Sequence, residues 1–147
     1  MDKREQILRR LVAITTALPE IKTVVRNQDE VSEHKRPAIA VFDADESVEE
    51  AVDRRDHPGH APTLLTMSPE VLILVGGQPQ TVGTTLNALR SQLIKAVLAD
   101  AELIGLAGAN GRVAYIGCST HLGHGRSMEG AMAVHFSFAY VLRPESL

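Results

Sequence analysis

The stretch Met132-Ala133-Val134-His135-Phe136-Ser137-Phe138-Ala139-Tyr140-Val141-Leu142 carries the clearest structural signal in the sequence. Every second residue from Met132 to Leu142 is large and apolar, whereas most of the residues between them are small or polar. Successive side chains of a β-strand point to opposite faces of the sheet. The alternation therefore predicts a strand over 131–142, with one face packed on helices and the other face small and flat.

A second stretch, Val71-Leu72-Ile73-Leu74-Val75, is apolar at every position rather than at alternate ones. A run of this kind is typical of a central strand that is covered on both faces. We therefore place it inside a longer strand over 64–75, and we expect something to cover each face of the sheet at this point.

Two segments have the 3.6-residue periodicity of amphipathic helices. The first spans 3–18, opens with Asp2 and Glu5 at capping-box spacing, and ends before Pro19. The second runs from a predicted N-cap at Thr81 to about residue 99, and Asp100 is placed to cap a short further turn.

Three shorter β-branched or apolar runs, over 21–26, 37–42 and 112–118, complete the expected strands. The predicted order is α-β-β-β-α-β-β in a single domain over residues 1–147. This order indicates an α+β fold in which a mostly antiparallel or mixed sheet of about five strands packs on two helices.

The segment 43–62 interrupts this pattern with seven acidic residues against only two basic ones, Arg54 and Arg55. It has too few apolar residues to bury itself, and a loop of this length in a small domain is usually functional or disordered. We interpret it as a long acidic hairpin arm or mobile loop, whose carboxylates are solvated.

Composition disfavours several classes of protein. The formal net charge is −3, so the chain has no overall positive charge to attract a phosphate backbone. Aromatic residues make up only 3% of the 147 residues, so few side chains could stack on bases. A nucleic-acid-binding protein is therefore disfavoured. No apolar run approaches the ~18 residues of a membrane span, and no signal-peptide core is evident at the start. We expect a soluble, unexported protein with no membrane partner. Its single cysteine, Cys118, cannot form an intramolecular disulfide.

Candidate chemical sites are weak. Two His pairs, His57 with His60 and His121 with His124, have ligand-like spacing, and Cys118 could join the second pair. Cys118 could also act as a nucleophile with His121 or His135 as base. The loop 123–127 could cradle an anion with Arg126. The histidines are more simply explained as exposed loop residues, Cys118 as a small buried residue at a strand end, and the loop 123–127 as a flexible hairpin tip. The sequence therefore predicts no catalytic residue, no metal and no cofactor.

Several stretches taken together resemble the tail terminator family, also called tail completion or minor tail protein U-like proteins, of long-tailed phages and gene transfer agents. The resemblance rests on their order and spacing over nearly the whole chain. The stretches are Ala17-Leu18-Pro19-Glu20-Ile21, Val24-Val25-Arg26-Asn27, Arg36-Pro37-Ala38-Ile39-Ala40-Val41, the polar arm, Thr85-Leu86-Asn87-Ala88-Leu89-Arg90 and the Gly-rich loop before the alternating final strand.

The resemblance implies a structural virion protein with no enzymatic activity and no cofactor. Members of the family form a homohexameric ring on the head-proximal end of the tail tube, stop tube polymerisation, and present the surface for the head–tail connector or stopper protein. The expected partners are therefore other copies of the chain, the tail tube protein and the connector, while DNA passes through the pore without specific binding. The expected location is the neck region of the virion, reached from the host cytoplasm during assembly.

Polar loops on a rigid sheet are common contact elements. We therefore expect contacts at the arm with Arg54 and Arg55, at the loop with His121, His124 and Arg126, and at the flat face that carries His135. The second faces of strands 71–75 and 131–141 are candidate packing surfaces. The charge of residues 43–56 further suggests an acidic pore lining that repels DNA.

Two other functions fit the sequence. One is a different head–tail neck protein, such as an adaptor or stopper. The other is a small α+β enzyme or ligand-binding protein that uses Cys118 and nearby histidines, which would need a deep pocket with perturbed titratable groups.

Overall fold

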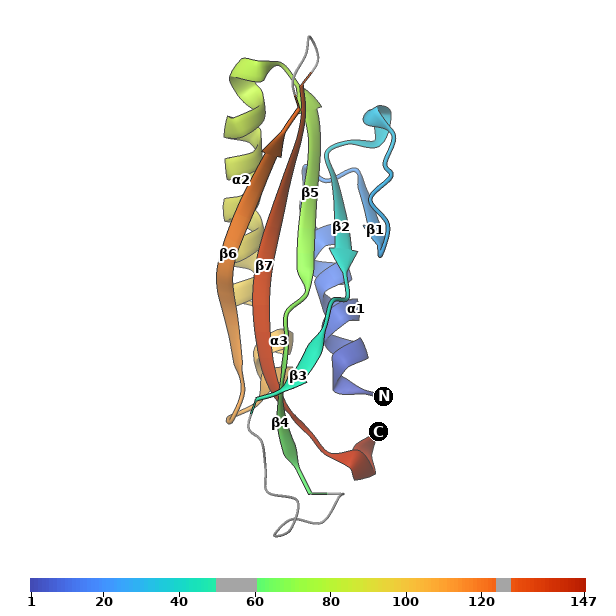
Figure 1. Ribbon diagram of the computed structural model, residues 1–147, viewed down its shortest axis with the longest axis vertical. Helices are drawn as coiled ribbons and strands as arrows, with labels where there is room; N and C mark the ends of the chain where they lie inside the picture. The colour runs from blue at the N-terminus through green and yellow to red at the C-terminus, as the bar shows by residue number, and fades with distance from the viewer. Residues whose placement is uncertain (50–60, 124–127) are drawn as a thin grey trace.

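The computed structural model describes residues 1–49, 61–123 and 128–147, and in these ranges the chain forms a mixed seven-stranded sheet with helices on one side (Figure 1). The helices are α1 (Lys3–Thr16), α2 (Pro79–Leu98) and α3 (Ala101–Ala107), with 3-10 turns η1 (Glu33–Lys35) and η2 (Pro144–Ser146). The strands are β1 (Thr23–Arg26), β2 (Ala38–Phe42), β3 (Glu46–Val48), β4 (Thr63–Met67), β5 (Glu70–Gly77), β6 (Arg112–Leu122) and β7 (Met128–Leu142). The predicted α+β class is confirmed.

The helix ends follow from local capping chemistry. The Asp2 carboxylate accepts a hydrogen bond from the Arg4 amide at 3.1 Å and starts α1, which ends two residues before the predicted position 18. The prediction of Thr81 as N-cap is wrong, because Pro79 already occupies the first turn of α2, where its missing amide is no loss. The predicted cap Asp100 is confirmed, since its carboxylate accepts from the Leu103 amide at 3.0 Å.

Strand β7 organises the sheet. One of its edges pairs with β5 and then β4, and its other edge pairs with β6, all antiparallel. Beyond β5 lies β2, which pairs antiparallel with β5 and parallel with β1. The mixed sheet expected from the sequence is therefore present.

The strand count rises from about five to seven because the predicted strand 64–75 is divided into β4 and β5, and because β3 forms inside the segment predicted as a loop. β4 and β5 keep one register against β7, with Met67 opposite Phe138 and Glu70 opposite His135. The break falls at Pro69, which has no amide to donate to the ladder. A second break, at positive-φ Ala44, separates β2 from β3. The predicted strand over 64–75 is thus one run of chain in constant register.

The hydrophobic core fills the space between the helices and one face of the sheet. It takes the large residues of β7 from Met132 to Tyr140 and pairs them with the apolar stripes of α1 and α2. This confirms the predicted alternation. Val71, Ile73 and Val75 of β5 lie on the same core-facing side.

The opposite face of the sheet has no helical layer in the described part of the chain (Figure 1). At one end Val31, from the segment between β1 and η1, packs with Ala38 and Leu74 in a small second cluster. Leu72 beside it is only partly buried. The helices cover the core-facing side of 71–75 as expected, whereas within the described residues the second face is covered only in part, by the segment before η1. We call this side of the sheet the open face.

Two predicted loops are shorter than expected. Residues 46–48 form β3 instead of loop, and β6 and β7 extend to Leu122 and back to Met128, so that His121 lies in a strand. Strand pairing continues beyond the apolar residues because backbone hydrogen bonds do not depend on side-chain type. Four expected contact residues, Arg54, Arg55, His124 and Arg126, lie outside the described residues.

Candidate interaction surface

Strand β6 forms one free edge of the sheet. Its eleven residues pair with β7 on one side, and no described strand pairs with the other side. The ladder is interrupted between Tyr115 and Gly117, so that Ile116 bulges out and exposes 57% of its surface. Gly117 takes a φ of 146°, a value that favours glycine at this bulge.

Helix α2 supports the middle of β6 through a polar contact. The Arg90 guanidinium donates to the Tyr115 hydroxyl at 3.0 Å, and its carbon lies 5.1 Å from the centre of the Tyr115 ring. The ring of Tyr115 meets Phe136 edge-on at 6.1 Å between centroids. Hydrogen bonding to Tyr115, and then to Cys118, raises the pKa of Arg90, so this position stays cationic.

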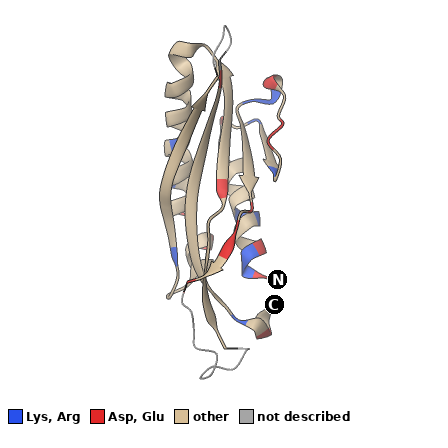
Figure 2. Ribbon diagram, viewed as in Figure 1, with Lys and Arg blue, Asp and Glu red and all other residues tan. Residues whose placement is uncertain are grey.

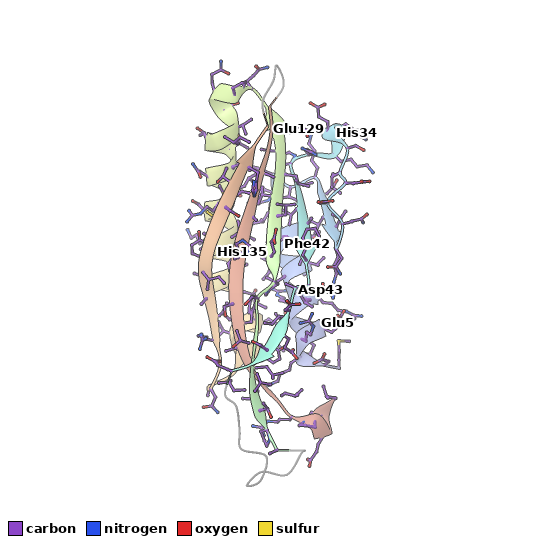
Figure 3. All side chains as sticks on the ribbon, viewed as in Figure 1. Glu5, His34, Phe42, Asp43, Glu129 and His135 are labelled. Carbon is purple, nitrogen blue, oxygen red and sulfur yellow. The ribbon has the colours of Figure 1, made fainter. Side chains whose placement is uncertain are left out.

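The structure separates the histidines from the thiol. Cys118 lies opposite Val134 on the helix side of β6, whereas His121 lies opposite Ala131 on the open face. His135 is also on the open face, between Gly117 and Glu70 (Figure 3). Four strand positions, or about 13 Å, separate the rows of His121 and His135. The strand geometry therefore does not pair Cys118 with His121 or His135, as a nucleophile and base would require.

A charged bridge crosses one end of the open face. Arg112 of β6 donates to the Glu49 carboxylate at 3.0 Å, and the Thr66 hydroxyl donates to the other Glu49 oxygen at 3.0 Å. The hydrogen bond from Arg112, and to a lesser extent the one from Thr66, lowers the pKa of Glu49. Ala139, which lies between Arg112 and Thr66 in the sheet, is fully buried. Glu49 is exposed, as predicted for the arm carboxylates, but it is also paired with Arg112.

The start of the predicted arm is fixed by two further polar contacts. The buried Tyr140 hydroxyl donates to the Glu46 carboxylate of β3. Arg26 donates to Asp43 at 2.8 Å and to both oxygens of Glu5 at 2.9 and 3.0 Å, so that one guanidinium joins α1, β1 and the turn after β2 (Figure 3). Hydrogen bonds from Arg26, and then Arg9, lower the pKa of Glu5 to about 2.

Sequence reasoning missed this group because Asp43 and Glu5 lie 17 and 21 residues from Arg26 and the three residues belong to no recognised motif. The one available signal was the grouping of Asp43 among acidic residues, with Arg26 at the end of the first strand. Pairing β1 with β2 in parallel then places Arg26 beside Val41, two residues from Asp43.

A groove of about 340 Å³ lies on the open face beside the β6–β7 hairpin. Leu74 and Ala131 form part of its floor, and His121 and Arg36 line its sides. Arg36 donates to the Val31 carbonyl at 3.2 Å and lies 4.0 Å from the Glu129 carboxylate. The groove therefore combines an apolar floor with one cation and one histidine.

Within residues 1–49, 61–123 and 128–147, no three His, Cys, Asp or Glu side chains are placed to hold a metal ion. None of the helices described is long and apolar enough to cross a membrane. No protein-family model matches the chain, and no curated protein is significantly similar to it.

Proposed function

We propose that this chain is the subunit of a ring that ends a phage-type tail tube and joins it to the head. In this role it is a non-enzymatic structural protein that binds other copies of itself, the tail tube protein and the head–tail connector or stopper protein. It acts in the neck of the virion after assembly in the host cytoplasm, and DNA crosses the ring without specific binding.

The observation that carries the proposal is the one-sided sheet. Helices cover one face, while the other face has no helical layer in the described chain and carries small, mostly buried side chains of β7 together with partly buried Leu72. The long edge of β6 is also free in the described chain. Surfaces of this kind usually meet another protein surface. The element order also agrees with the order on which the resemblance to tail terminators rests.

A closed ring needs two different surfaces on each subunit, since each copy meets the next one head to tail. A sheet with two unlike edges, β6 on one side and β1 with β3 on the other, offers such a pair. Tube polymerisation would stop because the ring occupies the growing end and presents a different surface beyond it.

The acidic segment 43–56 remains the candidate pore lining, although two of its carboxylates, Asp43 and Glu49, are already paired with Arg26 and Arg112. Any repulsion of DNA would therefore come from the other carboxylates of the segment. Introducing four lysines there should slow DNA ejection or reduce infectivity, and unchanged ejection and infectivity would exclude the pore role.

Negative-stain electron microscopy tests the proposed function directly. The purified protein is imaged over a range of concentrations, alone and with tail tubes from the same source. Six-fold rings, free or on one end of the tubes, are the expected result. Rings that bind the head connector but not tubes would favour another neck protein, such as an adaptor or stopper. A protein that forms no ring and binds no tube end would contradict the proposal and would favour the alternative of a small enzyme that uses Cys118.

A further inference from the structure

Charge is unevenly divided between the two flanks of the molecule (Figure 2). Helix α2 and strand β6 together contain three basic residues, Arg90, Lys95 and Arg112, and no acidic residue. Residues 1–49, which supply α1, β1, β2 and β3, contain eight basic and ten acidic residues. The flank of α2 and β6 is thus sparsely charged. The flank of α1 and β1 is densely charged and basic, with five basic residues and one acidic residue, and the acidic excess of residues 1–49 lies in 43–49.

Exposed apolar side chains are spread along β6, the end of α2 and the following helix α3. Seven large apolar residues are well exposed in the described part of the chain, and four of them belong to α2, α3 and β6. These four are Leu98 (39% exposed), Ile104 (51%), Ile116 (57%) and Leu122 (45%). Depletion of charge together with exposed apolar residues is the composition of a protein interface core.

The edge of β6 also lacks the usual protection against strand pairing. Residues 113–122 contain no Lys, Asp, Glu or Pro, and the bulge at Ile116 is the one feature that disturbs the edge. The opposite edge ends in β1, a strand of four residues that no described strand pairs on its outer side. β6 is therefore the edge that is built to accept a partner strand.

The directions of the strands fit head-to-tail pairing. β6 is antiparallel to β7, β7 to β5 and β5 to β2, while β1 is parallel to β2, so β6 and β1 run in opposite directions. A second copy that is rotated about an axis along the strands keeps these directions. Its β1 then meets β6 antiparallel, which is the more stable form of pairing.

We infer that the β6–α2 flank docks a second copy of this chain, which presents its α1–β1 flank so that β1 continues the sheet beyond β6. Main-chain hydrogen bonds supply the pairing, and Ile116 and Leu122 become buried. The inference deepens the proposed ring by assigning its subunit interface, but physically it needs only a second copy.

The first test places a charge on the docking flank. Ile116→Lys and, separately, Leu122→Lys are compared with wild type and with Leu147→Lys, which charges an exposed apolar residue at the C-terminal end. Sedimentation velocity gives the concentration at which each protein assembles, and thermal melts confirm folding. The two β6 variants should raise that concentration at least tenfold, whereas Leu147→Lys should match wild type.

The second test uses Cys118 as a natural probe, because it is the only cysteine of the chain and is exposed on β6. Thr23→Cys adds a thiol to β1 while leaving Cys118 in place. A short bismaleimide should link Thr23→Cys chains into ladders beyond a dimer and leave wild type uncrosslinked. Wild-type dimers linked through Cys118 would show β6 pairing with itself and would overturn the head-to-tail arrangement.

The outcomes separate this inference from the proposed function. If rings still form on tube ends in both β6 variants, the inferred interface is wrong and the proposed function stands. If the wild-type protein assembles but never binds tube ends, and Ile116→Lys abolishes its assembly, the interface is supported and the proposed function is excluded. Loss of tube binding with intact rings would show that the flank binds the tube protein, which overturns the inference.

Discussion

At the scale of single residues, Arg26 connects parts of the chain that share no local structure. Its guanidinium holds Glu5 from α1 and Asp43 from the turn after β2, and both carboxylates have a lowered pKa for this reason. All three side chains are partly exposed, so each pair is worth little alone. Their value lies in fixing the position of α1 against β1 and β2.

This network predicts a pH-dependent stability. The pKa of Glu5 falls from an ordinary 4.5 to about 2, so its stabilising effect is complete above about pH 5 and is lost as the pH falls toward 2. Glu5→Gln should therefore lower the free energy of unfolding by up to about 1 kcal/mol at pH 7. Urea titrations at pH 7, 4 and 2 should show the difference from wild type shrinking with pH.

The matched control is Glu145→Gln, which removes an exposed carboxylate near the C-terminus. It should leave the urea midpoint unchanged at pH 7. A Glu5→Gln deficit of the same size at pH 2 and pH 7 would mean that the ion pairs with Arg26 and Arg9 do not produce the effect.

At the scale of elements, the turn between α3 and β6 is set by close backbone packing. A Cβ on Gly111 would collide with the carbonyl oxygens of Ala107 and Ala139, which belong to α3 and β7. Because neither oxygen can move without shifting its own element, the absence of a side chain at Gly111 lets α3 and β6 approach β7 together. This contact positions the edge strand on the sheet.

Gly111→Ala should therefore destabilise the protein by about 3 kcal/mol, measured by urea or thermal unfolding. Gly105→Ala is the control within α3, since a Cβ there meets nothing within 4 Å. It should be neutral or stabilise by up to about 1 kcal/mol, because alanine favours a helix over glycine. Equal effects of the two substitutions would show that the close approach at Gly111 has no energetic cost.

At the scale of the whole molecule, the sheet is protected at its centre and open at its edges. β7 is paired on both sides and its large residues are buried, whereas the outer side of β6 faces no described strand. The molecule thus joins a stable core to an edge that gains protection only from a partner. Local stability of this kind is reported by amide hydrogen exchange.

Hydrogen exchange should therefore change at the edges when the protein assembles. Comparing free and assembled protein by mass spectrometry, we expect new protection over Arg112–Leu122 and Thr23–Arg26, with little change in β5 and β7, which are already slow. New protection confined to open-face residues around Leu72 and His135 would instead place the contact on the face of the sheet.

The sequence by itself determined the elements, because their signals are local. Alternation defined β7, the apolar stripe with Pro19 defined α1, and the capping carboxylate of Asp100 defined the start of α3. It also indicated the fold class, because helices and strands that are apolar on one face must bury those faces against one another. The two extra strands were beyond it. The missing amide at Pro69 divides β4 from β5 without changing the hydrophobic pattern, and β3 lies in a polar segment that the sequence predicts as a loop.

Only the tertiary structure decided which surfaces exist. It joined Arg26 to Glu5 and Asp43, and Glu49 to Arg112, across separations of up to 63 residues. It also placed Cys118 and His121 on opposite faces of one strand and left β6 at an edge. Local sequence sets backbone conformation over a few residues, whereas exposure and ion pairing depend on which distant segments the packed core brings together.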